Sequence, residues 1–187
     1  MAQKAIDLFQ TLRREPTDTI LIGLFSACAR LKHSRAISIG HEALSKMNSK
    51  YSNNVNVLTS ALDMYIKSGQ MNRAEKIFSK IKPKTVIKYG AMMKGYNMQD
   101  EPLKAWNLFK EMQNESIIPN EIIYLLLIDS CSEIGILSRC QRLVEQIPPS
   151  MQKIPEIQTG LIDMWVRKYT FVNSFELHAF SRVNVVQ

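Results

Sequence analysis

Histidine and cysteine are the residue types here that could hold a metal ion or act in catalysis, and neither type forms a cluster. The three histidines, His33, His41 and His178, are far apart along the chain. Zinc-dependent deamination of a base needs a His-x-Glu segment and a Cys-x-x-Cys pair, which the sequence lacks. It also has no glycine-rich phosphate loop and no motif for a Ser-His-Asp arrangement. We therefore expect no metal, no cofactor and no catalytic machinery in the chain as it stands.

The three cysteines, Cys28, Cys131 and Cys140, are odd in number and widely spaced. Each falls on an apolar helical stripe, which is typical of reduced core residues rather than of a disulfide framework. The N-terminus has no apolar signal-peptide core. The first fourteen residues are basic and amphipathic, as in a transit peptide, but they also match an element that recurs later. We interpret them as part of a repeat.

Lysine and arginine are the remaining residues with a clear chemical preference. Twenty-four Lys and Arg against seventeen Asp and Glu give a net charge of +7, which favours polyanionic partners through counterion release. Lys82, Lys84 and Lys88 gather near one predicted repeat junction, where they could contact phosphates or form a solvated face. No apolar run reaches the roughly 18 residues that cross a bilayer, so we expect no membrane partner.

The elements that must position these residues are helices, and they repeat. Leu58, Ala61, Leu62 and Tyr65 have the i, i+3, i+4, i+7 spacing that places four side chains on one helical face. Successive copies of this quartet begin 37, 31, 35 and 34 residues apart. The other copies are Leu21, Leu24, Phe25, Cys28; Tyr89, Met92, Met93, Tyr96; Tyr124, Leu127, Ile128, Cys131; and Gln158, Leu161, Ile162, Trp165.

A second quartet with a small first residue alternates with the first, about 16 residues later. Only a short side chain at that place lets the second helix approach the first closely. Its copies are Ala5, Leu8, Phe9, Leu12; Gly40, Ala43, Leu44, Met47; Ala74, Ile77, Phe78, Ile81; Ala105, Leu108, Phe109, Met112; and Cys140, Leu143, Val144, Ile147. The sequence therefore predicts stacked helix pairs, that is, an α-helical solenoid.

Glycine and proline positions agree with these helices. Gly69 and Gly135 stand where a first helix needs a left-handed residue at its end, and Pro102 stands where a second helix should begin. Further prolines follow the second helices, where the chain must turn back. These are Pro16, Pro83, Pro119 and Pro148.

The repeats resemble a known family. Residues 61–78 are similar to the short repeat of pentatricopeptide repeat proteins, and residues 89–96 and 105–112, followed by Ile118-Pro119-Asn120, are similar to its standard repeat. The resemblance implies an all-α, right-handed superhelical solenoid of antiparallel helix pairs. The competing tetratricopeptide class has 34 residues per unit, no regular 31-residue member, and a Trp–Leu-Gly–Tyr signature that is absent here.

Repeat boundaries set by this resemblance divide the whole chain. They give a partial repeat at 1–17, a long type at 18–54, a short type at 55–85, a standard repeat at 86–120, a long type at 121–154 and a degraded terminal repeat at 155–187. This order resembles the P-L-S subclass of plant-type organellar RNA editing factors, without the DYW deaminase domain. The last helix departs from the pattern, since Ser174, Leu177, His178 and Ser181 replace a small residue and three apolar ones, as in a truncated repeat or a frayed cap.

The resemblance implies binding of single-stranded RNA with one base per repeat. In the family, the fifth residue of the first helix and the last residue of the repeat discriminate bases, and the second residue wedges between them. The expected reading pairs are Ile22 with Asn54, Thr59 with Thr85, Gly90 with Asn120, and Leu125 with Ile154. The expected wedges are Thr19, Asn56, Ile87 and Ile122.

Helix capping is the alternative interpretation for Asn54, Thr85 and Asn120, because each precedes a predicted first helix. Ile22, Leu125 and Ile154 lack the polar atoms that a base edge requires, so two repeats remain as candidate readers. The side chain of Gly90 offers no hydrogen bond, and Asn120 is the best candidate for direct reading. Two readers at about 1–3 kcal/mol each cannot single out one transcript. We therefore expect a longer array, a partner such as another RNA-processing protein, or little sequence preference.

The resemblance implies a mitochondrial or plastid protein that supports RNA editing, processing or stability. A protein-interaction scaffold, with incidental basic charge, is the alternative from a different class. RNA affinity that weakens steeply with salt would favour RNA binding. A lack of RNA retention at low salt would favour the scaffold.

Overall fold

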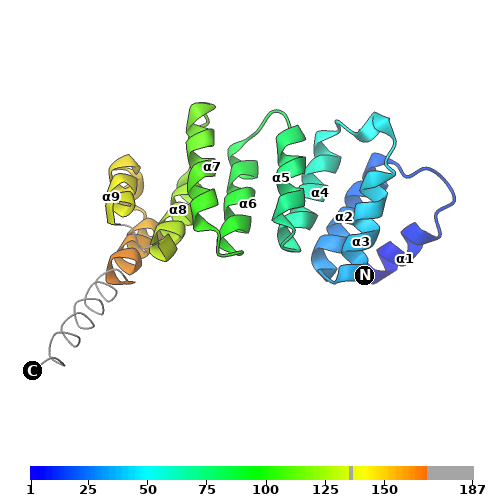
Figure 1. The fold of residues 1–187 in the computed structure, drawn as a ribbon, viewed down its shortest axis with the longest axis horizontal. Helices are drawn as coiled ribbons and strands as arrows, with labels where there is room; N and C mark the ends of the chain where they lie inside the picture. Colours follow the sequence, from blue (N-terminus) through cyan, green and yellow to red (C-terminus); the bar gives the residue numbers. More distant parts are fainter. Residues whose placement is uncertain (135–136, 168–187) are drawn as a thin grey trace, which may run out of the picture. The chain divides into compact units, whose positions relative to one another are not determined.

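The computed structural model describes residues 1–134 and 137–167, and within these ranges all regular structure is helical (Figure 1). The all-α fold expected from the sequence is confirmed. The helices are α1 (Ala2–Gln10), α2 (Asp18–Leu31), α3 (Ser34–Ser45), α4 (Val55–Lys67), α5 (Met71–Lys80), α6 (Val86–Asn97), α7 (Pro102–Asn114), α8 (Glu121–Ile134), α9 (Leu137–Gln146), the short 3-10 helices η1 (Ser49–Tyr51) and η2 (Met151–Lys153), and a helix over 155–167.

The chain forms two compact units, residues 1–99 and 100–187. In the N-terminal unit, α2 packs against α1, α3 and α4, and α4 packs against α5 and α6 (Figure 1). In the C-terminal unit, α8 packs against both α7 and α9. The first helices of successive predicted repeats are thus neighbours in the N-terminal unit, which places equivalent side chains of α2, α4 and α6 on adjacent helices.

The repeating quartets form the core of the middle repeats. All four residues of the first quartet are buried on each of α2, α4, α6 and α8, and all four residues of the second quartet on α7. Phe78 of α5 meets Tyr89 of α6 edge-on, with ring centroids 5.2 Å apart. Phe109 of α7 meets Tyr124 of α8 in the same way at 6.4 Å. Successive repeats therefore reuse one packing arrangement.

The quartets assigned to the two end helices are wrong in phase. On α1 the buried residue is Ile6, whereas Leu8 is 71% exposed. In the helix over 155–167 the buried residues are Ile157 and Met164, whereas Ile162 is 64% exposed. A helix that packs mainly against one neighbour, as α1 does against α2, buries only the strip that faces it.

Small residues occur where two helices approach closely. A Cβ atom added to Gly40 of α3 would overlap the sulfur of Met64 and would lie 3.4 Å from Sγ of Cys28. Ala74 and Ala105, at the same place on α5 and α7, are fully buried. The short side chain at the start of the second quartet on α3, α5 and α7 thus matches the packing that the sequence predicts.

Helix ends follow the predicted punctuation where the structure describes them. Gly69 has φ of 74°, its N–H donates to the carbonyl of Ile66 at 3.0 Å, and the N–H of Gln70 donates to the carbonyl of Tyr65 at 2.9 Å. These two bonds form a Schellman cap on α4. Pro102 is the first residue of α7. Gly135 and the residues of the predicted last helix, Ser174, Leu177, His178 and Ser181, lie outside the described residues.

Two tyrosines tie first helices to the preceding second helix. The hydroxyl of Tyr65 on α4 lies 2.8 Å from Nδ1 of His41 on α3. The hydroxyl of Tyr96 on α6 donates to Oε1 of Glu75 on α5, also at 2.8 Å. His41 and Glu75 each follow the small residue of the second quartet, so both bonds fix the same register between repeats. Burial raises the pKa of Tyr65, against the opposing charge of Arg73.

Candidate nucleic-acid interface

A strip of side chains runs along each first helix on the side away from the buried quartet, and we call it the reading face. It begins with the second and fifth residues of the predicted repeat and includes the residue four positions later, because this spacing keeps all three on one side of a helix. Its members are Thr19, Ile22 and Ser26 on α2; Asn56, Thr59 and Asp63 on α4; Ile87, Gly90 and Lys94 on α6; and Ile122, Leu125 and Asp129 on α8.

The expected wedge residues are all exposed at the start of their helices. Ile87 is 78% exposed and Ile122 is 61% exposed, and Asn56 and Thr19 are exposed as well. An exposed isoleucine at the same place in two repeats contributes nothing to the core. Each could instead cover the flat face of a base.

The fifth residues offer few polar groups. Ile22 is a half-buried aliphatic side chain, and Gly90 is buried. The Thr59 hydroxyl donates to the carbonyl of Val55 at 2.6 Å, which leaves its oxygen as an acceptor. A base edge opposite these helices would therefore meet one hydroxyl.

Both asparagines expected to read bases cap helices. Oδ1 of Asn54 accepts from the backbone N–H groups of Asn56 and Val57 at 3.0 and 3.3 Å. Oδ1 of Asn120 accepts from the N–H of Ile123 at 3.1 Å. Capping uses only the amide oxygen, so the amide nitrogen is the group of each side chain that could donate to a base.

The reading pairs of the N-terminal unit lie on adjacent helices. Asn54 directly precedes α4, which packs against α2 and its Ile22. Thr85 directly precedes α6, which packs against α4 and its Thr59, and Thr85 makes no side-chain capping bond.

The three lysines proposed for phosphates differ in their surroundings. Nζ of Lys84 lies 4.9 Å from the ring centroid of Phe78 and 5.7 Å from that of Tyr89, so it packs over this aromatic pair. Nζ of Lys88 donates to the carbonyl of Pro83 at 3.1 Å, and Lys82 is exposed. All three place an ammonium group near the turn between α5 and α6.

Lys94 is a cation that lies outside the repeat motif and was not among the expected site residues. It follows Ile87 by seven residues and Gly90 by four, so it shares their side of α6, and its side chain is exposed. Helical spacing counted from Ile87 is the signal that could have found it. Lys94 gives the reading face of α6 a charge that the expected readers lack.

Among the described residues, the histidines and cysteines cap a helix, bond between helices or lie buried in the core. No group of His, Cys, Asp and Glu there could hold a metal ion. His33 caps α3, its Nδ1 accepting from the N–H of Ala36 at 3.1 Å. Burial raises the pKa of the Cys28 thiol to about 11, so this thiol stays protonated at neutral pH.

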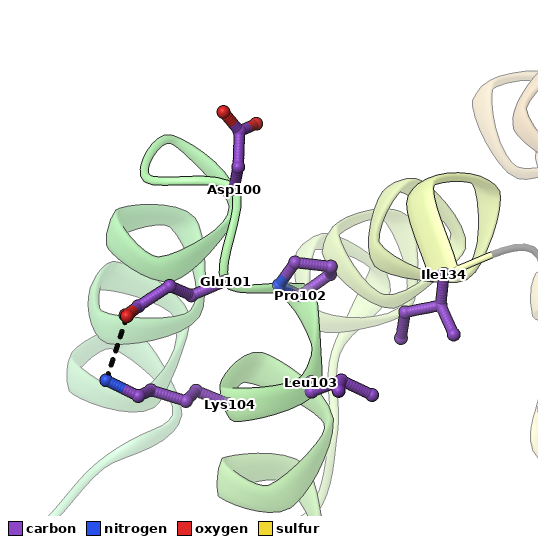
Figure 2. Close-up of a pocket in the computed structure, with 6 residues that line it drawn as sticks. All are labelled: Asp100, Glu101, Pro102, Leu103, Lys104 and Ile134. Carbon is purple, nitrogen blue, oxygen red and sulfur yellow. Dashed lines mark ion pairs between the residues drawn. The ribbon is translucent and has the colours of Figure 1, made fainter.

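A pocket of about 560 Å³ lies in the C-terminal unit, between the start of α7 and the end of α8. Figure 2 shows Pro102 and Leu103 facing Ile134, whereas Asp100 points away. Glu101 and Lys104 pair with each other at 3.0 Å. The pocket therefore lacks the converging polar groups that orient a small substrate.

Within the described ranges, no helix is long and apolar enough to serve as a candidate membrane span.

Two family models match the middle of the chain. One is described as PPR repeat and matches residues 57–82, and the other is described as PPR repeat family and matches residues 84–133. The two matches cover α4 to α8 almost completely.

Curated relatives include three proteins of Arabidopsis thaliana. The mitochondrial pentatricopeptide repeat-containing protein At2g03380 is 29% identical over 169 residues, which cover 88% of this chain and 24% of the relative. The chloroplastic protein At1g08070 is 28% identical over 83% of this chain and 22% of its own length. The mitochondrial protein At3g26782 is 32% identical over 73% of this chain and 21% of its own length. The chain thus spans less than a quarter of the length of these relatives.

Solved structures show the same fold at low sequence identity. The PPR domain of Arabidopsis thaliana protein-only RNase P 1, in complex with tRNA, has a TM-score of 0.62 and 16% identity, and the match covers 84% of this chain and 90% of that one. The pentatricopeptide repeat protein PPR10, in complex with an 18-nt psaJ RNA element, has a TM-score of 0.64 and 18% identity over 94% of this chain and 26% of its own. Family models, relatives and fold agree, and the chain therefore belongs to the pentatricopeptide repeat family.

Proposed function

We propose that the chain binds single-stranded RNA along the reading faces of its first helices and has no catalytic role as it stands. The observation that carries the proposal is the repeated reading face, with Ile87 and Ile122 exposed at its start and Lys94 further along α6. Aliphatic side chains can contact bases and cations can contact phosphates. Two proteins of the same fold have structures in complex with RNA, which supports the same ligand class here.

The repeat boundaries given by the sequence belong to this proposal. Long, short and standard repeats would follow one another over 18–54, 55–85, 86–120 and 121–154. This order supports the P-L-S subclass and a role in editing-site recognition, processing or stability of a transcript. The relatives named mitochondrial and chloroplastic support an organellar location. In such a role the chain would act with other RNA-processing proteins.

Sequence preference should be modest, because few reading groups are polar. Thr59, Thr85 and the amide nitrogens of Asn54 and Asn120 are the groups that could bond to base edges. Each good base contact provides about 1–3 kcal/mol of discrimination. The chain on its own would thus prefer certain bases without selecting one transcript site, and further repeats or a partner would supply the rest.

The direct test is binding of the purified chain to short, labelled single-stranded RNAs of random sequence, measured by fluorescence anisotropy at several salt concentrations. The RNA should bind, and the logarithm of its affinity should fall linearly with the logarithm of the salt concentration. The slope should be about −0.7 for each phosphate contacted. An RNA duplex of the same length serves as the matched competitor and should bind more weakly, because its bases are not open to the reading face.

Lack of RNA retention at low salt would contradict the proposal. The chain would then be better explained as a scaffold that binds protein.

A further inference from the structure

The two compact units carry opposite net charge. Residues 1–99 contain sixteen Lys and Arg and six Asp and Glu, a net charge of +10, whereas residues 100–187 contain eight and eleven, a net charge of −3. If each acidic residue of the N-terminal unit paired with one cation, ten cations of that unit would still have no carboxylate partner within it. The charge of +7 for the whole chain therefore understates the attraction of the first unit for a polyanion.

The contrast sharpens in two stretches of sequence. Residues 76–99 contain six lysines and no acidic residue. Residues 111–138 contain five acidic residues and neither lysine nor arginine. The first stretch includes the turn between α5 and α6 and all of α6, and the second includes the turn between α7 and α8 and all of α8. Equivalent parts of two successive predicted repeats thus differ in sign.

The reading faces show the same division. In the N-terminal unit the reading face of α6 carries Lys94. The reading face of α2 continues to the exposed Arg30 near the end of that helix. On α4 it is neutral on balance, since Lys67 pairs with Asp63 at 2.7 Å. On α8 of the C-terminal unit the charged residues along the face are Asp129 and Glu133, and Glu133 lies 3.7 Å from Arg167 of the same unit.

Two cations of the C-terminal unit already pair with carboxylates of that unit. Nζ of Lys104 lies 3.0 Å from a carboxylate oxygen of Glu101. Arg167 pairs with Asp163 at 2.9 Å and with Glu133 at 3.7 Å. Of the six cations that the structure describes in this unit, these two lie beside carboxylates, and the acidic residues of the unit outnumber its cations. A phosphate there would therefore be attracted less than in the N-terminal unit.

Lys80 is the exposed last residue of α5. We propose that residues 1–99 hold the phosphate backbone of the RNA, chiefly through Lys80, Lys82, Lys88 and Lys94, and that the C-terminal unit contributes few phosphate contacts. This inference rests on the proposed function. Release of counterions from phosphates dominates the affinity for RNA and requires cations without carboxylate neighbours. The N-terminal unit supplies them, and the acidic reading face of α8 does not.

Two matched variants of the full chain test the division. In the first, Lys80, Lys82, Lys88 and Lys94 are replaced by Gln. In the second, Lys104, Lys110, Arg142 and Lys153 of the C-terminal unit are replaced by Gln. Each removes four positive charges, and Lys84 is left in place because it packs on Phe78 and Tyr89. Circular dichroism and thermal unfolding report whether each variant folds. Should the first not fold, a variant with only the exposed Lys82 and Lys94 replaced takes its place.

Binding of a single-stranded oligouridylate is measured for the chain and both variants between low and moderate salt. The first variant should bind at least about tenfold more weakly at 0.1 M salt and lose about 2–3 from its salt slope. The second should stay within about twofold of the unaltered chain, with the same slope. Equal weakening by both variants, or an unchanged slope in the first, would overturn the division while leaving RNA binding itself intact. No RNA binding by the unaltered chain would overturn the proposed function, and this inference with it.

Discussion

The turn between α5 and α6 and the turn between α7 and α8 occupy the same place in two successive predicted repeats, with similar cores and opposite surfaces. Each is flanked by an edge-on aromatic pair, Phe78 with Tyr89 in one unit and Phe109 with Tyr124 in the other. The surface of the first turn carries lysines, whereas the second turn begins with Glu115 and is followed by Glu121. Packing thus constrains the buried positions of a repeat and leaves its charge free to vary.

This difference indicates where function is encoded in the chain. A helix pair needs its quartets and its small residue to stack, and these are alike in both units. The exposed positions are under no such demand, so we expect their charge to follow what each repeat contacts. Substitutions at buried positions should therefore act alike in the two units, and substitutions at exposed positions should act differently.

The largest effect is expected from the shared aromatic pairs. Phe78→Ala and Phe109→Ala each remove a buried ring, and each should lower the free energy of unfolding by about 3–5 kcal/mol. Urea unfolding followed by circular dichroism measures both. A loss below about 1 kcal/mol for one of them would show that the two cores are not equivalent.

The next effect concerns the caps that begin α4 and α8. Asn54→Ala and Asn120→Ala each remove an oxygen that accepts backbone N–H groups, so each should cost about 0.5–2 kcal/mol of stability. If Asn120 also reads a base, its variant alters base preference at one position in a randomised-RNA selection. Reduced stability with an unchanged preference would assign Asn120 to capping alone.

A smaller effect distinguishes the two lysines of the first turn. Lys84→Gln removes an ammonium group that packs over two rings and should cost about 0.5–1 kcal/mol, whereas Lys82→Gln, at an exposed residue, should leave stability unchanged. Thermal unfolding of the two variants gives the comparison. Equal stability would mean that the contact of Lys84 with Phe78 and Tyr89 contributes nothing measurable.

The smallest effect is a gain. Replacing Asp129 with Asn and Glu133 with Gln removes both carboxylates from the reading face of α8. RNA should then bind about two- to fivefold more tightly at low salt, because repulsion of phosphates is relieved, and the difference should vanish at high salt. Unchanged affinity at low salt would show that RNA does not approach α8.

Sequence alone predicted the middle of the fold well. Each helix there packs against several neighbours, so its apolar residues must recur at regular spacing. Leu58 and Tyr89 open quartets that are buried throughout. The pattern failed at the ends, where Leu8 and Ile162 were assigned to buried faces and are exposed. A helix with one main neighbour needs only a narrow apolar strip, so a four-residue pattern carried over from other repeats overstates it.

The candidate site was less predictable than the fold. Family motifs point to positions such as Asn54 and Asn120, but the same side chains cap helices, and the sequence cannot say which bonds an amide oxygen makes. Lys94 was missed because no motif includes it, although its spacing from Ile87 puts it on the same face. The difference in net charge becomes visible only when the chain is divided at the boundary between its two compact units, which the sequence does not mark.

The most direct test of whether residues 1–99 hold the RNA is photo-crosslinking of the intact chain to a 4-thiouridine-labelled single-stranded RNA. Mass spectrometry identifies the attached peptides. Crosslinks should concentrate in residues 1–99, above all in peptides that contain α6. A majority of crosslinks in residues 100–167 would show that the acidic unit carries the RNA and would contradict the inference from charge.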